Sequence, residues 1–349
     1  MIDHKISNQV LTLGVKHTPP VGGIAQLINS YKNIISPFKF ISTTGISHCK
    51  VMNLIILFIA IVKIIVQLPS YKIAHIHTAS NVSFWRKTLL INILKLCNKK
   101  IIIHIHGGKF KEFYNTSPDK IKSTLLKADR VVVLSNSWKL YFENIIGLNN
   151  VCVVNNVISK PMLTKTEKND KIHFLFLGNL SRAKGFFDLF EAIITSKKEL
   201  EGKAVFHIGG NGDVEEINNY IVEHDVKDLI KLHGFVQGAI KNELLNKCDV
   251  FILPSYIEGL PISILEAMSY GAAIISTKVG GIPDIVNSNN GILINPGEIN
   301  ELASSIIFLI NNPVIVEKMK TEGLKISNSY SKENVEHQLF QLYLEVLNE

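Results

Sequence analysis

The sequence has little cysteine and little charge. Of its 349 residues, only 19% are charged and 46% are hydrophobic, a composition that excludes an intrinsically disordered chain. The four cysteines, at positions 49, 97, 152 and 248, lie far apart, so neither a disulfide framework nor a zinc site of closely spaced cysteines is expected. The N-terminal residues lack the charged lead, apolar core and cleavage site of a signal peptide, which favours a cytoplasmic protein.

Acidic residues are nearly absent from the first half. None occurs between Asp3 and Glu112, and residues 1–165 hold 21 Lys and Arg against five acids, a net charge of +16. Residues 166–349 hold 16 Lys and Arg against 25 acids, a net charge of −9. A basic half attracts phosphate, whether of nucleic acid, an anionic bilayer or a phosphorylated substrate. A merely solvated basic surface is the alternative.

A clean uncharged stretch of about 20 residues, which a membrane-spanning helix needs, is also missing. Residues 51–68 are strongly apolar but include Asn53, Lys63 and Gln67. We therefore expect a buried or interfacial helix here rather than a spanning one.

The chain does contain short β-branched apolar runs that alternate with helical stretches. Strands are predicted at 10–15, 73–77, 100–105, 131–134, 151–155, 173–177, 204–208, 230–232, 250–253 and 273–276. This alternation predicts an α/β fold of parallel sheets with helical crossovers. We expect two Rossmann-like doubly wound domains, at 1–165 and 166–330, facing across a ligand-binding cleft. A C-terminal helix within 331–349 should pack back towards the first domain.

The densest chemical signal lies in residues 254–268. A buried strand ends at Leu253, and a turn of Gly259, Leu260 and Pro261 then leads into a helix. Backbone N–H groups and the helix dipole at such a turn can bind a phosphate.

Two glutamates flank this turn, and carboxylates there can accept hydroxyls of a ribose or another sugar. Either one alone is explained as a solvated surface acid. Glu258 and Glu266 have seven residues between them, and this spacing in this context resembles the E-x7-E motif of the retaining glycosyltransferases of family 4, which have the GT-B fold. The resemblance extends over most of the C-terminal half, including 178–185, 209–212, 233–235 and 277–283, and is looser in the N-terminal half.

The resemblance implies a role for each matching residue. Glu258 would contact hydroxyls of the donor sugar, Glu266 would bind the ribose of the nucleotide, and the backbone of 259–261 would hold the diphosphate. Lys184 would neutralise the diphosphate as it leaves. The segment 233–236 would line the base pocket through backbone groups, so the identity of the base is not legible.

The match is incomplete at one strand end. The family usually has arginine where this chain has Asn179. Either Arg182, three residues further along the same turn, supplies that guanidinium, or the leaving group has one cation fewer around it. Gly210 lies in a glycine cluster that the resemblance places beside the nucleotide.

Gly22 and Gly23 follow a predicted strand in the basic half. The resemblance assigns their loop to the donor diphosphate and the acceptor, because glycine allows a close approach to a ligand. A plain strand-to-helix turn is the alternative.

Two His-x-His pairs, His75/His77 and His104/His106, each place two imidazoles on one face of a strand, so a metal site has to be considered. Neither pair has cysteine or carboxylate neighbours, and no metal is expected. His106 matches the strand-end His-Gly of the family, where the imidazole contacts the donor sugar, and His77 is a weaker candidate. The other two are expected in the core.

Aromatic and basic residues are interleaved near two predicted strand ends, at 84–87 and 109–114. Such pairs are typical of interfacial anchors, and ordinary loop packing is the alternative. With the basic half, they favour an acceptor carried on a membrane lipid diphosphate. The expected protein is peripheral on the inner face of the cell membrane and acts in bacterial surface polysaccharide synthesis, such as O-antigen (lipopolysaccharide) or capsule.

The resemblance implies transfer of a hexosyl group from a nucleoside-diphosphate sugar to an acceptor hydroxyl with retention, without a cofactor. No Asp-x-Asp motif occurs, and no metal is needed if Lys184 and helix N-termini supply the positive charge. Two alternatives stay open. A nucleotide-sugar epimerase shares the fold, but its acid/base carboxylates would be expected in the nearly acid-free half. A nucleic-acid-binding protein suits the basic half, although no nucleic-acid-binding motif is present and no nucleic-acid partner is expected.

Overall fold

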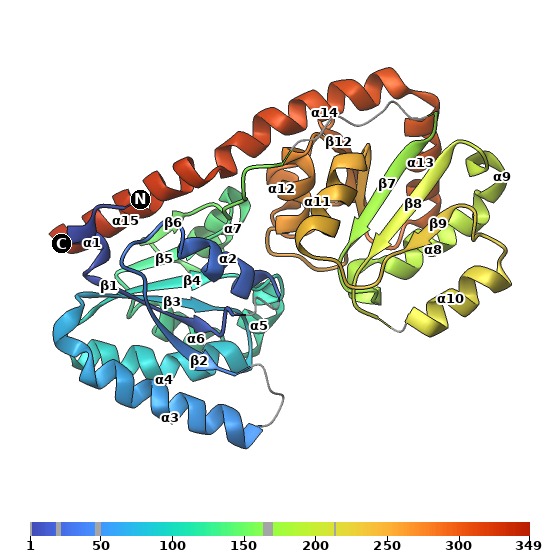
Figure 1. Ribbon diagram of the computed structural model, residues 1–349. Coiled ribbons are helices and arrows are strands. Elements are labelled where there is room, and N and C mark those ends of the chain that lie inside the picture. The colour runs from blue at the N-terminus through green and yellow to red at the C-terminus, as the bar shows by residue number, and fades with distance from the viewer. Residues whose placement is uncertain (1, 19–21, 46–49, 163–169, 213) are drawn as a thin grey trace. The chain divides into compact units, whose positions relative to one another are not determined.

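The computed structural model describes residues 2–18, 22–45, 50–162, 170–212 and 214–349 (Figure 1). The chain divides into two compact units. The N-terminal unit comprises Met1–Ile158 and Tyr330–Glu349, and the C-terminal unit comprises Ser159–Ser329. The boundary predicted at residue 165 lies outside the described residues.

Six parallel strands form the sheet of the N-terminal unit, in the order β2-β1-β3-β4-β5-β6. The strands are β1 (Val10–Val15), β2 (Lys39–Thr44), β3 (Ile73–Thr78), β4 (Lys100–Ile105), β5 (Arg130–Val133) and β6 (Val151–Val153). The first strand of this unit lies between β2 and β3, so the strand order reverses there. Doubly wound sheets bind ligands at the carboxyl ends of the strands beside such a reversal.

Helices cover both faces of this sheet. On one face lie α2 (Gly23–Tyr31), the short α1 (His4–Ser7) and α15 (Lys332–Asn348) (Figure 1). The other face is covered by α3 (Lys50–Val66), α4 (Val82–Leu96), α5 (Phe110–Thr116), α6 (Pro118–Leu125) and α7 (Asn136–Tyr141), followed by a π-helical turn, Phe142–Ile146. Side chains of the second group share one hydrophobic core with the strands.

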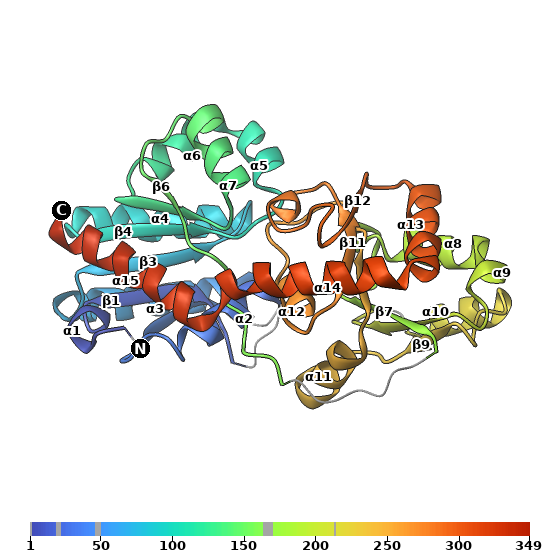
Figure 2. The ribbon, with the colours of Figure 1, turned by 90° about the horizontal axis from the view of Figure 1, so that it is seen from above.

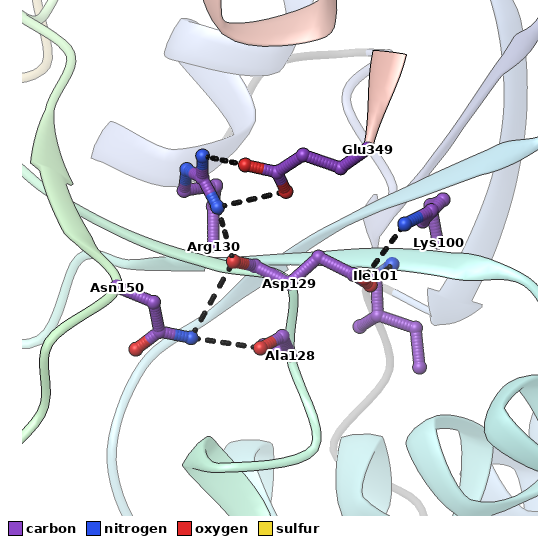
Figure 3. A network of polar contacts seen from close by, with 7 residues as sticks. All are labelled: Lys100, Ile101, Ala128, Asp129, Arg130, Asn150 and Glu349. Atoms are coloured by element: carbon purple, nitrogen blue, oxygen red, sulfur yellow. Dashed lines mark hydrogen bonds and ion pairs between the residues drawn. The ribbon is translucent and has the colours of Figure 1, made fainter. Parts of the chain in front are cut away.

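The last helix belongs to the N-terminal unit. Figure 2 shows α15 lying across the sheet, and it contacts β3. The hydroxyl of Tyr343 lies 2.7 Å from Nδ1 of His75. At the end of the helix, Glu349 forms an ion pair with Arg130, whose guanidinium also donates to the carbonyl of Asp129 at 2.9 Å (Figure 3). The carboxylate of Asp129 accepts the backbone N–H of Ile101 at 2.7 Å. Polar contacts therefore link the end of α15 to the beginnings of β4 and β5.

The exposed side of α3 is apolar. Among residues 51–66 of this helix, only Leu57, Ala60 and Ile64 are buried. We call its solvent-facing apolar side chains the α3 apolar face, which consists of Val51, Met52, Leu54, Ile55, Phe58, Ile59, Val62, Ile65 and Val66. Among the described residues no single helix is long and apolar enough to cross a membrane; one bent pair, 299–311 with 313–348, passes that test by length and composition together.

The C-terminal unit contains a second six-stranded parallel sheet, in the order β12-β11-β10-β7-β8-β9. Its strands are β7 (Ile172–Leu177), β8 (Ala204–Gly209), β9 (Ile230–Leu232), β10 (Val250–Leu253), β11 (Ala273–Thr277) and β12 (Gly291–Ile294). Its helices are α8 (Phe186–Thr195), α9 (Lys197–Leu200), α10 (Val214–Glu223), α11 (Gly238–Lys247), α12 (Ile262–Ser269), α13 (Ile299–Asn311) and α14 (Pro313–Ser327). The order reverses between β7 and β10, as in the Rossmann arrangement.

The predicted fold class is confirmed: both units are doubly wound α/β sheets, and each of the ten predicted strands is present to within two residues at its ends. Two strands were missed, β2 and β12, which lie at sheet edges. The prediction of interfacial anchors was wrong for several residues, because Phe84, Lys87, Phe110 and Phe113 are buried in the core. Trp85 is 38% exposed on α4, and Lys111 stacks over the rings of Trp138 and Tyr141.

Candidate functional site

Two loops of the C-terminal unit meet at its topological switch point. One follows β7 and contains the 3-10 turn Arg182–Lys184, and the other follows β10 and leads to α12. The backbone N–H of Tyr256 donates to the carbonyl of Ala183 at 3.0 Å, which joins the two loops. Parallel strands that are neighbours in a sheet bring the side chains of their carboxyl ends together, so residues about 75 positions apart in sequence become neighbours here.

Glu258 and Lys184 form an ion pair at this point. Lys184 Nζ lies 2.5 Å from Glu258 Oε1, and the same oxygen accepts the hydroxyl of Ser255 at 2.8 Å. Glu258 is only 8% exposed. A buried carboxylate is costly unless it is paired and hydrogen-bonded, and Lys184 and Ser255 provide these partners and fix its position.

Glycines let the backbone pack tightly around this pair. Gly185 has φ of +66°, and a Cβ there would overlap the carbonyl oxygen of Pro254. Gly280 has φ of +56°, and a Cβ there would overlap the carbonyl oxygen of Glu258. Both positions therefore require glycine, for conformation and for space.

The predicted phosphate turn precedes α12 directly. Pro261 is the N-cap of this helix, Leu260 is buried, and the carbonyl of Gly259 accepts the N–H of Gly281 at 2.7 Å. The N-terminus of α12 is the positive end of its dipole, and its first turn contains no acidic residue. This arrangement favours an anion.

Glu266 lies on α12, one turn after Ile262, and is paired with a lysine that the sequence did not indicate. Nζ of Lys241, on α11, lies 2.7 Å from Oε1 and 2.7 Å from Oε2 of Glu266. Both glutamates of the spaced pair are thus held by a lysine from another element. Sequence gives no local signal for Lys241, since the contact depends on how α11 packs beside α12.

Two other predicted site residues, Asn179 and Arg182, are exposed in the loop after β7. Asn179 is exposed at the start of the loop after β7. Arg182 is exposed as well, and its guanidinium carbon lies 5.7 Å from the ring centre of Phe187. The structure brings Lys184 onto Glu258, whereas it directs Arg182 to an aromatic side chain at the surface.

The glycine cluster after β8 packs against its neighbouring loops. Gly210 donates its N–H to the carbonyl of Gly234 at 2.7 Å, and Gly178 donates to the carbonyl of Gly209 at 3.0 Å. A Cβ at Gly210 would overlap the carbonyl oxygen of Gly178. Glycine is therefore required here by the contact of two protein loops, and the segment expected at the base pocket is fixed beside it.

In the N-terminal unit, Gly22 has φ of +85° and is the N-cap of α2, which begins at Gly23. Both glycines are exposed, and a Cβ at either would meet no atom within 4 Å. Residues 19–21 of the same loop lie outside the described residues.

The four histidines of the His-x-His pairs form two hydrogen-bonded pairs across β3 and β4. Nδ1 of His77 lies 2.9 Å from Nε2 of His106, with ring planes 13° apart. Nε2 of His75 lies 3.2 Å from Nδ1 of His104, with ring planes 3° apart. Burial lowers the pKa of His75 and of His106 to about 3, so these imidazoles are neutral near pH 7.

Three of these rings, His75, His77 and His104, present nitrogens within 4.8 Å of one another. A tetrahedral metal about 2.1 Å from each nitrogen would require separations of about 3.4 Å. In this arrangement the nitrogens that face each other are hydrogen-bonded, and the Nε2 atoms of His77 and His104 have no hydrogen-bond partner among the described residues. No local pattern in the sequence indicated that His77 would lie within hydrogen-bonding distance of His106.

A buried amine lies close to this cluster. Lys87, on α4, is fully buried, and its Nζ has no hydrogen-bond partner in the described parts of the chain. Burial, with a smaller effect of Arg86, lowers the pKa of Lys87 to about 7. This residue cannot present its charge to a lipid phosphate, as its sequence neighbourhood had indicated.

Comparison with protein families places the conserved domain in the C-terminal unit. Residues 162–325 match the family described as glycosyl transferases group 1. This range lies within Ser159–Ser329 and contains the Lys184, Glu258 and Glu266 sites.

Curated relatives are glycosyltransferases. The chain is 25% identical over 352 residues to the 2-deoxystreptamine N-acetyl-D-glucosaminyltransferase of Niallia circulans, covering 92% of this chain and 88% of that protein. It is 25% identical over 267 residues to the amylovoran biosynthesis glycosyltransferase AmsK of Erwinia amylovora, covering 71% of this chain and 65% of that protein.

Solved structures agree in fold. Sucrose-phosphate synthase from Thermosynechococcus elongatus superposes with a TM-score of 0.79 at 17% identity, covering 97% of this chain and 99% of that one. HepE from Anabaena, solved with UDP, superposes with a TM-score of 0.77 at 17% identity, covering 97% of this chain and 100% of that one. The chain is a glycosyltransferase with the GT-B fold, and most of its C-terminal unit matches the family of glycosyl transferases group 1.

Proposed function

We propose that this glycosyltransferase uses a nucleoside-diphosphate sugar and transfers the sugar with retention of anomeric configuration, as a family 4 enzyme. The observation that carries the proposal is the ion pair of Lys184 with the buried Glu258 beside the N-terminus of α12. The pair places a fixed cation and a sugar-binding carboxylate at the carboxyl ends of β7 and β10. A nucleotide-sugar donor needs both groups together: a carboxylate that accepts hydrogen bonds from the hydroxyls of the sugar, and a positive charge that stabilises the diphosphate.

In this proposal Lys184 and the N-terminus of α12 stabilise the diphosphate as it leaves. The carboxylate of Glu258 accepts hydroxyls of the sugar, which fixes the anomeric carbon relative to the acceptor. Glu266 binds the ribose. His106 contacts the donor sugar as a neutral imidazole, and its hydrogen bond with His77 fixes the ring.

The charge on the leaving group is met by protein groups, so we propose that the enzyme needs neither a metal ion nor a cofactor. Lys184 is 30% exposed and already oriented by Glu258. Activity that is unchanged by EDTA would agree with this assignment, and activity restored only by added Mg²⁺ or Mn²⁺ would contradict it.

For the acceptor we propose a saccharide on a lipid diphosphate, in the synthesis of a bacterial surface polysaccharide such as O-antigen or capsule. The α3 apolar face supports a membrane-bound acceptor. The segment between Asp3 and Glu112, which contains α3 and α4, has no acidic residue, so the charged side chains of these two helices are all basic, which suits anionic headgroups. The relative named for amylovoran biosynthesis supports a polysaccharide product. The protein would then be cytoplasmic and peripheral on the inner face of the cell membrane.

The donor is tested by binding and turnover with UDP-, GDP-, ADP- and dTDP-sugars, with and without membranes. We expect one nucleotide sugar to raise the melting temperature and to be consumed, and both effects to disappear in Glu266→Ala. Retention is read from the anomeric configuration of the product by NMR. No response to any donor would contradict a nucleotide-sugar substrate, and a free epimerised sugar without acceptor would favour the epimerase alternative.

Membrane binding is tested by vesicle flotation with phosphatidylcholine alone and with added phosphatidylglycerol. Binding should require the anionic lipid and should fall about tenfold or more in Phe58→Ser, because a phenyl ring contributes roughly 1.5–3 kcal/mol when it is buried. Phe58 is 67% exposed; Phe308, 44% exposed on α13, is the matched control. Equal binding of Phe58→Ser and Phe308→Ser would contradict the assignment.

A further inference from the structure

The geometry of the ion pair between Lys241 and Glu266 bears on nucleotide binding. The ammonium nitrogen of Lys241 is equidistant from the two carboxylate oxygens, at 2.7 Å from each. The side chains of Lys241 and Glu266 are only 19% and 16% exposed. A contact of this geometry restrains the carboxylate plane more strongly than a single hydrogen bond to one oxygen would.

The position of Lys241 within α11 does not by itself favour a lysine. The helix α11 begins at Gly238, so Lys241 lies in its first turn, at the positive end of the helix dipole, where a cation is disfavoured. No acidic residue occurs in that turn. The compensating contact is with Glu266 on α12, which belongs to the site and not to the helix that carries the lysine.

We propose that Lys241 is a positioning residue for the nucleotide: it orients the carboxylate of Glu266 so that both oxygens accept the 2′- and 3′-hydroxyls of a ribose. This inference rests on the proposed function, in which Glu266 binds the ribose. A carboxylate accepts about four hydrogen bonds, so a bridging ammonium and two hydroxyls are compatible in number. Without the lysine, the carboxylate of Glu266 loses the contact that restrains both of its oxygens, and the last side-chain torsion of a glutamate is intrinsically broad.

The proposal separates the effect of Lys241 from that of Lys184. Lys241 acts on the part of the donor that does not react, whereas Lys184 acts on the leaving group. Lys241→Met should therefore raise the KM for the donor about tenfold and leave kcat unchanged, as expected when uniform binding is lost.

The decisive experiment measures discrimination between sugars of the nucleotide. The Kd is determined by calorimetry for uridine, guanosine, adenosine and thymidine diphosphates, each in its ribo and 2′-deoxy form. We expect the wild type to prefer one ribonucleotide over its 2′-deoxy form about tenfold or more, since a hydrogen bond to a charged group is lost. Lys241→Met should bring this ratio close to one, and Lys241→Arg should keep most of it.

The control is Lys247→Met. Lys247 lies on the same helix and pairs with Glu243, which is 63% exposed, so its loss should leave the ratio unchanged. A Lys241→Met protein that binds nucleotides with the wild-type ratio overturns the role of Lys241 alone. Absence of binding of every diphosphate to the wild type overturns the proposed function. Should Lys241→Met fail to fold, Lys241→Gln replaces it, with a smaller loss of the ratio expected and a retained ratio overturning the proposal.

Discussion

Each unit contains a six-stranded parallel sheet, but the two units differ in the charge of the side chains near the carboxyl ends of their strands. The N-terminal unit contains 20 Lys and Arg and nine acids, a net charge of +11, and the C-terminal unit contains 17 and 21, a net charge of −4. In the more acidic unit, Lys184 in the loop after β7 and Lys241 on α11 are both paired with carboxylates. In the basic unit, the strand-end groups are neutral imidazoles.

This difference divides the chemistry. A neutral hydrogen-bonded imidazole suits uncharged hydroxyls, and it lies in the unit whose excess positive charge is spread over the surface. The C-terminal unit holds Lys184 and Lys241 in ion pairs with carboxylates, and in the proposed function Lys184 stabilises the leaving diphosphate. In the proposed function, substrate attraction and leaving-group stabilisation therefore fall to different halves of the chain.

The largest effect on this contrast is expected when the pH is lowered. Burial lowers the pKa of His75 and of His106 to about 3, and it lowers the pKa values of His77 and His104 well below the ordinary value of a histidine. Their contribution to the unfolding free energy is complete above pH 6.5 and is lost as the pH falls towards 3, because the unfolded chain takes up protons first. His75 and His106 alone should cost about 5 kcal/mol at pH 4.5. Burial lowers the pKa of His207, in the other unit, only to about 4.

Hydrogen exchange at pH 7 and at pH 4.5, corrected for the intrinsic exchange rate, measures both units in one sample. Protection should fall earlier in β3 and β4 than in β7 and β10. A C-terminal unit that opens at the same pH as the N-terminal unit, or at a higher one, would remove the contrast.

The next largest effect concerns the fixed cation. Lys184→Met should lower kcat about 100- to 1000-fold at saturating donor, the usual cost of removing one preorganised charge from a transition state. The matched control is Lys197→Met, since Lys197 pairs with Asp225 at the surface of the same unit. A Lys184→Met enzyme with kcat within tenfold of the wild type would sink the leaving-group role.

A smaller effect is expected when a side chain is added at Gly185, where the loop after β7 contacts the loop after β10. Gly185→Ala combines an unfavourable φ of +66° with overlap on Pro254 and should lower the unfolding free energy of the C-terminal unit by about 2–4 kcal/mol. Gly202 has φ of +74° but no atom within 4 Å of a Cβ, so Gly202→Ala should cost only about 1–2 kcal/mol. Urea unfolding of both variants isolates the contribution of the loop contact, and equal midpoints would refute it.

The smallest effect is expected for the second cation. Arg182 is exposed and stacks on Phe187, so its field at the site is screened by water. Arg182→Ala should lower kcat about three- to tenfold, and the difference should shrink in 0.5 M salt. A loss as large as that of Lys184→Met would show that Arg182 moves into the site when the donor binds.

Sequence reasoning was most successful where one segment carries the whole signal. The run of apolar residues at 250–253, the turn at 259–261 and the spacing of Glu258 and Glu266 are all local, and the structure has a strand, a turn and a helix there. Strand β2 was missed because Lys39–Thr44 is half polar and partly buried, as suits an edge. Strand β12 is short and follows an asparagine-rich turn, so it gave a weak pattern.

What could not be predicted depends on contacts between distant segments. Lys241 meets Glu266 across 25 residues, and His77 meets His106 across 29. Both contacts are set by helix packing or strand register, which no local spacing encodes. The burial of Lys87 has the same origin, because only the packing of α4 on the sheet decides that its amine points inward.

The return of the chain to the N-terminal unit has a consequence for the order of synthesis. Residues 330–349 follow the whole C-terminal unit, yet they supply Tyr343 for His75 and Glu349 for Arg130. On the ribosome the C-terminal unit can finish folding as soon as Ser329 has emerged, whereas the N-terminal unit, although made first, must wait for the last helix. The half that is translated earlier is therefore the half that matures later.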